Sequence, residues 1–121
     1  MPIKNILVVD DSPTDRRHLS DILVKSGYAV TTAESGEDAL AKVKLQRPDL
    51  VLMDVVMPGQ SGYQATRTLS KDESTKNIPV IICTTKGQET DRIWGMRQGA
   101  RDYIVKPVSQ AELLAKISAL G

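Results

Sequence analysis

The stretch Ile-Leu-Val-Val-Asp-Asp-Ser-Pro at residues 6–13 decides the fold class of this chain. Four consecutive apolar residues without alternation are typical of a strand that is covered on both faces. The polarity then changes abruptly at Asp10 and Asp11, and Ser12 followed by Pro13 fits an N-cap with proline in the first helical turn. The stretch therefore predicts a buried strand that ends in two carboxylates and leads directly into a helix.

Further apolar runs repeat this pattern along the chain. They lie at residues 29–30, 50–53, 80–83 and 103–105. Gly27 and Gly99 are placed to end helical segments, and Ser35 and Ser109 each stand three residues before an acidic residue, as in a capping box. This alternation predicts an α/β fold with a parallel sheet, helices on both faces and right-handed crossovers.

Length and composition narrow the class of protein. With 121 residues the chain has room for a single domain, and a net charge of +1 gives no long-range attraction to nucleic acid or membranes. Cys83 is the only cysteine and lies in an apolar run, so we expect a buried, unreactive thiol and no internal disulfide, which fits a reducing cytoplasm. No signal peptide or membrane span is apparent. We therefore expect a cytoplasmic protein without nucleic-acid or membrane partners.

Polar side chains follow four of the five predicted strands. They are Asp10 and Asp11, Asp54, Thr84 and Lys106. In an open parallel sheet, ligands bind at the carboxyl ends of the strands. A single aspartate there often only caps the next helix, and for Asp10 or Asp11 alone that explanation is preferred. Capping does not account for Lys106, however, so the set as a whole predicts a site.

The three aspartates predict a magnesium site if the first and third strands are neighbours. Two like charges about 4 Å apart repel by roughly 4 kcal/mol at an effective dielectric constant near 20, so such a cluster needs a cation or a protonated carboxyl. Oxygen ligands without His or Cys suit Mg²⁺. His18, the only histidine, falls on the first helix, which disfavours zinc.

The same residues can support phosphoryl transfer. A carboxylate can attack phosphorus to form an aspartyl phosphate, and the transferred group needs positive partners and hydrogen-bond donors. Asp54 stands alone after the middle strand and is the best nucleophile candidate, whereas the adjacent Asp10 and Asp11 fit metal ligands. Mg²⁺, the Lys106 ammonium and the Thr84 hydroxyl would be the partners.

These motifs resemble the receiver domain of bacterial two-component response regulators, the family of the chemotaxis protein CheY. The matching motifs lie at residues 7–12, at 54–59 with Gly62, at Thr84 and at 103–107. The resemblance runs from about Lys4 to the C-terminus and implies one receiver domain over residues 1–121. It also implies a flavodoxin-like, doubly wound three-layer α/β/α sandwich, with five helices and a five-stranded parallel sheet of order 2-1-3-4-5.

The resemblance also implies roles for individual residues. It makes Asp54 the phosphoacceptor and one of the magnesium ligands. Asp10 and Asp11 bind Mg²⁺ directly or through water, and the backbone carbonyl of Val56 supplies a further ligand. Lys106 pairs with the phosphoryl group, and its peptide bond to the following proline is usually cis in this family.

The switch implied by the resemblance uses Thr84 and Tyr103. On activation Thr84 shifts toward the phosphoryl group and Tyr103 turns inward behind it, which changes a protein-binding face on helix four, strand five and helix five. A histidine kinase is the implied phosphodonor and a downstream protein the target. We expect a monomer without enzymatic turnover beyond self-phosphotransfer and slow autodephosphorylation, with phosphorylation-dependent dimerisation as the alternative.

Some segments of the sequence resemble one subfamily of receivers more closely than the rest. Residues 84–103, with 57–59 and 64–67, look like the stand-alone receivers of twitching-motility chemosensory systems, of the PilH type, which predicts a role in chemotaxis or type IV pilus signalling. Trp94 in this segment could anchor a partner or pack between helices. Gly95 predicts a weakened fourth helix. Val56 neither positions nor activates water, which predicts a long-lived phosphoryl group.

Other functions remain open at this point. A phosphate sink that drains a shared kinase would need the same residues as a signalling receiver. A phosphatase of the aspartyl-phosphate type, as in the haloacid-dehalogenase superfamily, needs a second aspartate two residues after the nucleophile, where this chain has Val56. A dinucleotide-binding module is weaker still, because residues 10–13 contain no glycine-rich turn.

Overall fold

The computed structural model describes residues 2–120 as one sheet of five strands alternating with five helices. The strands are β1 (Asn5–Val9), β2 (Ala29–Ala33), β3 (Leu50–Met53), β4 (Val80–Thr84) and β5 (Asp102–Val105). The helices are α1 (Pro13–Lys25), α2 (Gly36–Leu45), α3 (Gly62–Lys71), α4 (Glu89–Arg97) and α5 (Gln110–Leu120). All neighbouring strands are parallel and the order is β2-β1-β3-β4-β5, which confirms the predicted topology.

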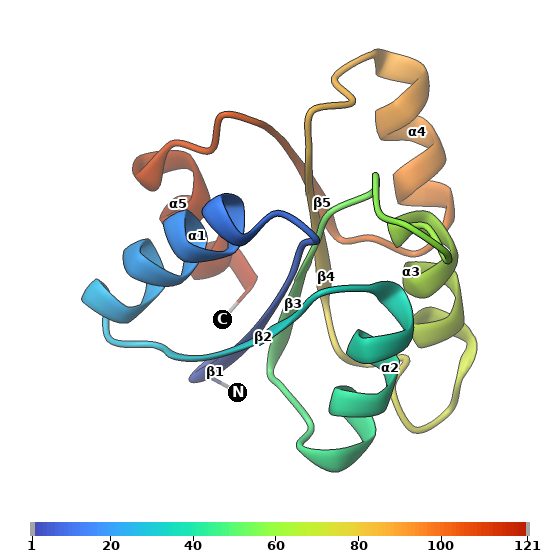
Figure 1. Ribbon diagram of the computed structural model, residues 1–121, viewed down its shortest axis with the longest axis horizontal. Coiled ribbons are helices and arrows are strands. Elements are labelled where there is room, and N and C mark those ends of the chain that lie inside the picture. The colour runs from blue at the N-terminus through green and yellow to red at the C-terminus, as the bar shows by residue number, and fades with distance from the viewer. Residues whose placement is uncertain (1, 121) are drawn as a thin grey trace.

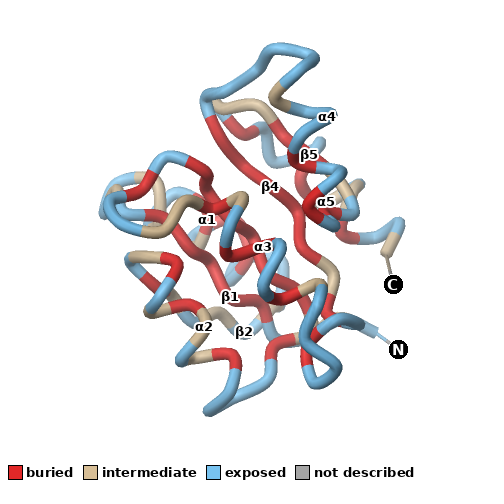
Figure 2. Tube along the Cα trace, turned by 90° about the vertical axis from the view of Figure 1, so that its right-hand side faces the viewer, coloured by how far each residue is buried: buried red, intermediate tan, exposed pale blue. Residues whose placement is uncertain are grey.

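The helices form two layers around the sheet. Helices α1 and α5 cover one face, and α2, α3 and α4 lie on the other (Figure 1). Each face has its own apolar core, one built with Leu23 and Leu113 from α1 and α5, the other with Val43 and Leu69 from α2 and α3. Strand β4 is buried along its length in Figure 2, and every residue of β3 is buried as well, as their unbroken apolar runs predict.

Serine caps set the starts of several helices as the sequence predicts. Ser12 accepts a hydrogen bond from the Asp15 backbone N–H at 3.3 Å, and Ser35 accepts one from the Asp38 N–H at 3.1 Å. Ser109 does the same for the Glu112 N–H at 3.1 Å. These caps fix the residue at which each helix begins. They therefore also fix the positions of the polar residues between the end of a strand and the start of the next helix.

Helix α4 is the most weakly buried of the five, because Gly95 is its only buried residue (Figure 2). Trp94 is 49% exposed, so of the two alternatives for this side chain, the structure does not bury it between helices. A Cβ at position 95 would lie 2.8 Å from the Ile82 side chain and 3.0 Å from the Tyr103 ring. The glycine therefore lets the helix approach strands β4 and β5 closely, a packing role that the sequence did not indicate.

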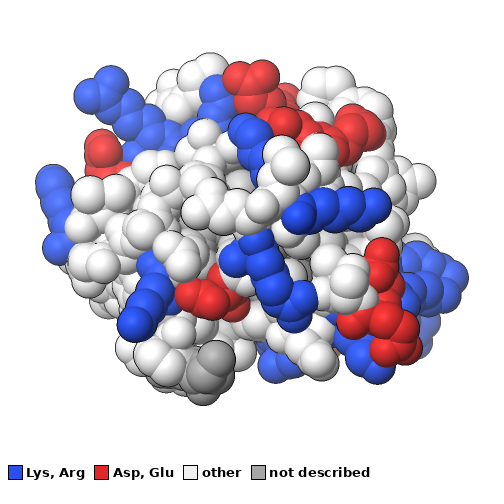
Figure 3. Space-filling model, turned by 90° about the horizontal axis from the view of Figure 1, so that it is seen from below, with Lys and Arg blue, Asp and Glu red and all other residues white. Residues whose placement is uncertain are grey.

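Basic and acidic side chains are interspersed over the face seen in Figure 3. Within residues 2–120, no helix combines the length and apolarity that a membrane crossing requires. Cys83 is buried, and this burial raises the pKa of its thiol to about 12, in line with the unreactive thiol that we expected.

Candidate functional site at the carboxyl ends of the strands

The pairing of β1 with β3 brings the aspartates together. Val9 is the partner of Met53 in the parallel ladder, and the backbone N–H of Asp54 donates to the Val9 carbonyl at 2.9 Å. Asp10 and Asp54 therefore leave neighbouring strands at the same level. Carboxylate oxygens of Asp10, Asp11 and Asp54 lie within 4.8 Å of one another, as the sequence predicts. Asp10 and Asp54 are buried, whereas Asp11 is exposed.

Lys106 reaches this cluster from the end of β5. Its backbone N–H donates to the Thr84 carbonyl at 2.8 Å, which extends the β4–β5 ladder by one residue, and its peptide bond to Pro107 is cis. The ammonium nitrogen lies 2.7 Å from Asp10 Oδ2 and 3.8 Å from Asp54 Oδ2. Burial disfavours the charged lysine, but hydrogen bonds to Asp10 and Asp15, together with the negative charges of Asp54 and Asp10, outweigh it and raise the pKa of Lys106.

Asp15 is a member of the site that sequence reasoning missed. Its Oδ2 accepts a hydrogen bond from the Lys106 ammonium at 2.9 Å. It lies in the first turn of α1, and its carboxylate is not part of the group that could share a metal ion. The only signal in the sequence is an acidic residue one helical turn after the two aspartates.

The electrostatics single out Asp54. Burial raises the pKa of its carboxyl from an ordinary 3.8 to about 6, and the Asp10 carboxylate adds to the shift. The Lys106 ammonium, the Val55 N–H that donates to Asp54 Oδ1 at 2.8 Å, and the Thr84 hydroxyl act in the opposite direction. Asp54 thus has a higher proton affinity than a free aspartate, and an additional cation beside it would favour its ionised form.

The loop after Asp54 folds tightly against it. A Cβ at position 62 would lie 1.8 Å from the backbone oxygen of Asp54, so only glycine fits where α3 begins. The Gly62 N–H donates to the Val55 carbonyl at 3.0 Å. This close approach fixes the path of residues 55–61 and leaves the Val56 side chain 55% exposed at the rim of the site. The metal role of the Val56 carbonyl stays a prediction.

Behind the site, Thr84 and Tyr103 are fully buried. The Tyr103 hydroxyl donates to the Lys86 carbonyl at 2.7 Å and lies 3.2 Å from the Tyr63 hydroxyl. Tyr63 in turn donates to the Asp91 carbonyl of α4 at 3.1 Å. Tyr103 is therefore in the inward position that the resemblance associates with activation, and Tyr63 is a partner that sequence reasoning did not identify.

The donor set fits a hard divalent cation. Three carboxylates supply oxygen ligands only, and no histidine or cysteine within the described residues joins their group. Mg²⁺ prefers such oxygen ligands and keeps several of its waters, which the exposed side of Asp11 permits. Asp10, Asp11 and Asp54 are the residues that could hold it.

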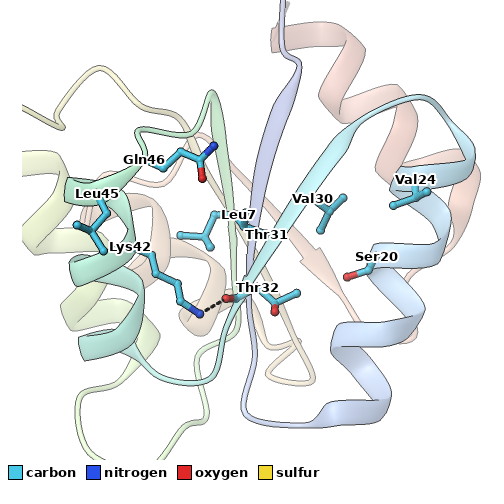
Figure 4. Close-up of a pocket in the computed structure, with 9 residues that line it drawn as sticks. All are labelled: Leu7, Ser20, Val24, Val30, Thr31, Thr32, Lys42, Leu45 and Gln46. Atoms are coloured by element: carbon cyan, nitrogen blue, oxygen red, sulfur yellow. Dashed lines mark hydrogen bonds between the residues drawn. The ribbon is translucent and has the colours of Figure 1, made fainter.

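A cavity of about 490 Å³ lies away from this cluster, between α1 and α2 over the edge strand β2 (Figure 4). Its lining contains Val24, Val30 and Leu45, and its one charged side chain, Lys42, donates to the Thr32 carbonyl. Its lining contains no carboxylate, and therefore no group of carboxylates that could bind a cation. The chemistry at the strand ends therefore marks the better candidate for the functional site.

Comparisons with known proteins identify the family of this chain. The model of the response regulator receiver domain matches residues 6–118. The chain is 56% identical over 115 residues to protein PilH of Pseudomonas aeruginosa, with 95% of each chain covered. It is 42% identical over 117 residues to the phosphate regulon regulator PhoB of the same species, but spans only 51% of that protein. Among solved structures, the CheX-CheY-BeF3-Mg complex of Borrelia burgdorferi matches with a TM-score of 0.89 and 31% identity, over 97% of this chain and 88% of that one.

Proposed function

The chain belongs to the response regulator receiver family, and on that premise we propose that it is a phosphorylation switch with Asp54 as the phosphoacceptor. The observation that carries the proposal is the buried Asp54 carboxylate, clustered with two further aspartates and 3.8 Å from the Lys106 ammonium. A histidine kinase is the proposed phosphodonor. Residues 1–121 act as a single receiver domain in this proposal.

Phosphorylation would proceed by displacement at phosphorus. An Asp54 carboxylate oxygen forms the new O–P bond while the P–N bond of a phosphohistidine breaks and its electron pair returns to the imidazole. A pKa of about 6 leaves most of Asp54 ionised at neutral pH and above, so the nucleophile is available. Lys106 offsets charge on the transferred group. Mg²⁺, held by Asp10, Asp11, Asp54 and the Val56 carbonyl, would neutralise further charge there.

The same chemistry disfavours a true phosphatase. Turnover of phosphoesters by this route needs an acid or base two residues after the nucleophile, and Val56 supplies neither. We therefore propose self-phosphotransfer and slow autodephosphorylation as the only reactions of this chain. A phosphate sink for a shared kinase would use the same site, and competition between two receivers for one kinase would separate the two roles.

The output of the switch would be a protein-binding face on α4, β5 and α5. The Thr84 hydroxyl interacts with Asp54 and also accepts the Lys86 N–H at 3.4 Å. The Tyr103 hydroxyl donates to the Lys86 carbonyl, in the loop that enters α4. Exposed apolar side chains on α4 offer contact area to a partner; they are Ile93, Trp94 and Met96. Tryptophan is enriched at binding hot spots, and methionine is enriched at protein interfaces. Phosphorylation would stabilise this face by holding Thr84 and Tyr103 in place.

The similarity to PilH supports a place in type IV pilus or chemotaxis signalling. We further propose that the protein acts in the cytoplasm and as a monomer. We propose that output there comes from protein contact through the exposed apolar side chains of α4.

A two-dimensional NMR titration tests the switch. We expect Mg²⁺ with beryllofluoride, a phosphoryl mimic, to shift the amide signals of residues 54–62 and also those of α4 and β5. The Asp54→Asn variant is the control and should show none of these shifts when Mg²⁺ and beryllofluoride are added. Signals that move only around Asp54, with α4 unchanged, would contradict the proposed output face.

A further inference from the structure

The Lys106 ammonium lies closer to Asp10 and Asp15 than to the proposed phosphoacceptor Asp54. Its ammonium lies 2.7 Å from Asp10 and 2.9 Å from Asp15, but 3.8 Å from Asp54. The lysine side chain is only 11% exposed, so its reach is limited by the surrounding protein. A phosphoryl group on Asp54 must therefore draw the ammonium away from carboxylates that already bind it.

The aim of the Asp15 side chain follows from the start of α1. As the third residue of the helix, Asp15 stands where a carboxylate ordinarily accepts a hydrogen bond from the N-cap backbone N–H. Here the Ser12 N–H donates instead to Asp10 Oδ1 at 3.0 Å. The Asp15 carboxylate is thereby released from its usual capping partner and bonds to Lys106 across the site.

We propose that Asp15 is a positioning residue that competes with the phosphoryl group on Asp54 for the Lys106 ammonium. The inference rests on the proposed function. Asp15 helps to hold the Lys106 ammonium 3.8 Å from the Asp54 carboxylate, outside hydrogen-bond distance of the acceptor. Its strength as a competitor then determines how tightly the protein holds a phosphoryl group.

Asp15 suits this role better than Asp10 does. Asp10 belongs to the carboxylate cluster, so a bound divalent cation would take up its charge and repel the nearby ammonium. Asp15 lies outside that cluster and remains free to hold Lys106 in the metal-loaded protein. Its side chain is 42% exposed, so water weakens the pair and lets the lysine exchange. Exposed pairs of this kind change an equilibrium by about two- to fivefold.

The test is the affinity for beryllofluoride at saturating Mg²⁺, measured by the Trp94 fluorescence or by NMR. We expect Asp15→Asn to bind the mimic about two- to fivefold more tightly than the wild type. Asp15→Glu, which keeps the charge, should restore an affinity close to that of the wild type. Asp21→Asn is the matched control, because Asp21 lies on the same helix, is 63% exposed and has Arg17 as its one ion-pair partner within residues 2–120. It should leave the affinity unchanged.

The outcomes separate this inference from the proposed function. A wild type that fails to bind beryllofluoride overturns the proposed function and the inference with it. A wild type that binds, with Asp15→Asn binding equally well or more weakly, overturns the inference alone. A second readout needs no phosphoryl chemistry: the NMR signal of the Lys106 ammonium should shift in Asp15→Asn and return in Asp15→Glu. A signal that stays the same in all three proteins would also overturn the inference.

Discussion

Strands β1 and β3 and the aspartate that follows each of them form two parts that are both buried but chemically opposite, an apolar half and a charged half. The apolar residues 6–9 and 50–53 are at most 1% exposed. The aspartates that follow them, Asp10 and Asp54, are 1% and 6% exposed. Burial of the apolar half stabilises the fold, whereas burial of a carboxylate opposes it. The polar ends are therefore not explained by stability, and the apolar halves below them hold the charges in place.

The largest effect should come from the apolar half. Leu52→Ala removes a side chain that is 1% exposed and packed in the core under α1 and α5. We expect the free energy of unfolding to fall by about 2–5 kcal/mol, because a cavity remains. Urea unfolding measures this. Leu45→Ala, at a leucine that is 87% exposed, should change it by less than about 0.5 kcal/mol. Equal losses at the two positions would contradict the comparison.

The charged half should respond in the opposite direction. In the metal-free protein, with a chelator present at pH 8, Asp54→Asn should raise the free energy of unfolding by about 1–3 kcal/mol, since it removes a buried charge. Asp21→Asn, at an exposed aspartate, is the control. A loss of stability in Asp54→Asn would show that the Asp54 carboxylate stabilises the fold, contrary to this account.

The pH dependence of that gain follows from the pKa of Asp54. The carboxyl ionises near 3.8 in the unfolded chain and near 6 in the folded one, so the folded chain binds more protons between these values. The contribution of Asp54 to stability is fully present below about pH 4 and is lost as the pH rises through 6. The advantage of Asp54→Asn should therefore shrink as the pH is lowered from 8 to 5, in denaturant titrations of both proteins.

The smallest effect on stability should occur at Val56, which is exposed at the rim of the site formed by the strand ends. Val56→Asn changes a side chain that is 55% exposed, so the free energy of unfolding should change by less than about 0.5 kcal/mol. We expect the phosphorylated variant to lose its phosphoryl group several-fold faster, because an amide can orient water for attack. Val24→Asn, at a valine that is 58% exposed on α1, is the control. Unchanged or slower loss would refute the predicted role of Val56.

The sequence indicates the apolar halves and the chemistry of the strand ends well. Unbroken apolar runs predict the buried strands, and the motif resemblance predicts the order in which they pair. Where parallel strands end together, Asp10 and Asp54 must meet, so the cluster follows from topology. These features depend on the path of the backbone, which local patterns largely determine.

Features that depend on the direction of single side chains escaped prediction. The contact of Asp15 with Lys106 exists because Asp10 already accepts the Ser12 N–H, a competition that spacing does not reveal. The hydrogen bond between Tyr63 and Tyr103 joins residues from α3 and β5. Gly95 is explained only by the Tyr103 ring and Ile82 beneath it. Each depends on packing between elements that are distant in sequence.

The central claim, that the buried carboxylate of Asp54 accepts a phosphoryl group, is tested most directly by intact mass spectrometry. The protein is incubated with Mg²⁺ and acetyl phosphate, alongside a magnesium-free sample and the Asp54→Asn variant. The account predicts a single phosphoryl adduct that requires both Mg²⁺ and Asp54. No adduct on a folded, magnesium-binding protein, or an adduct that persists in Asp54→Asn, would contradict it.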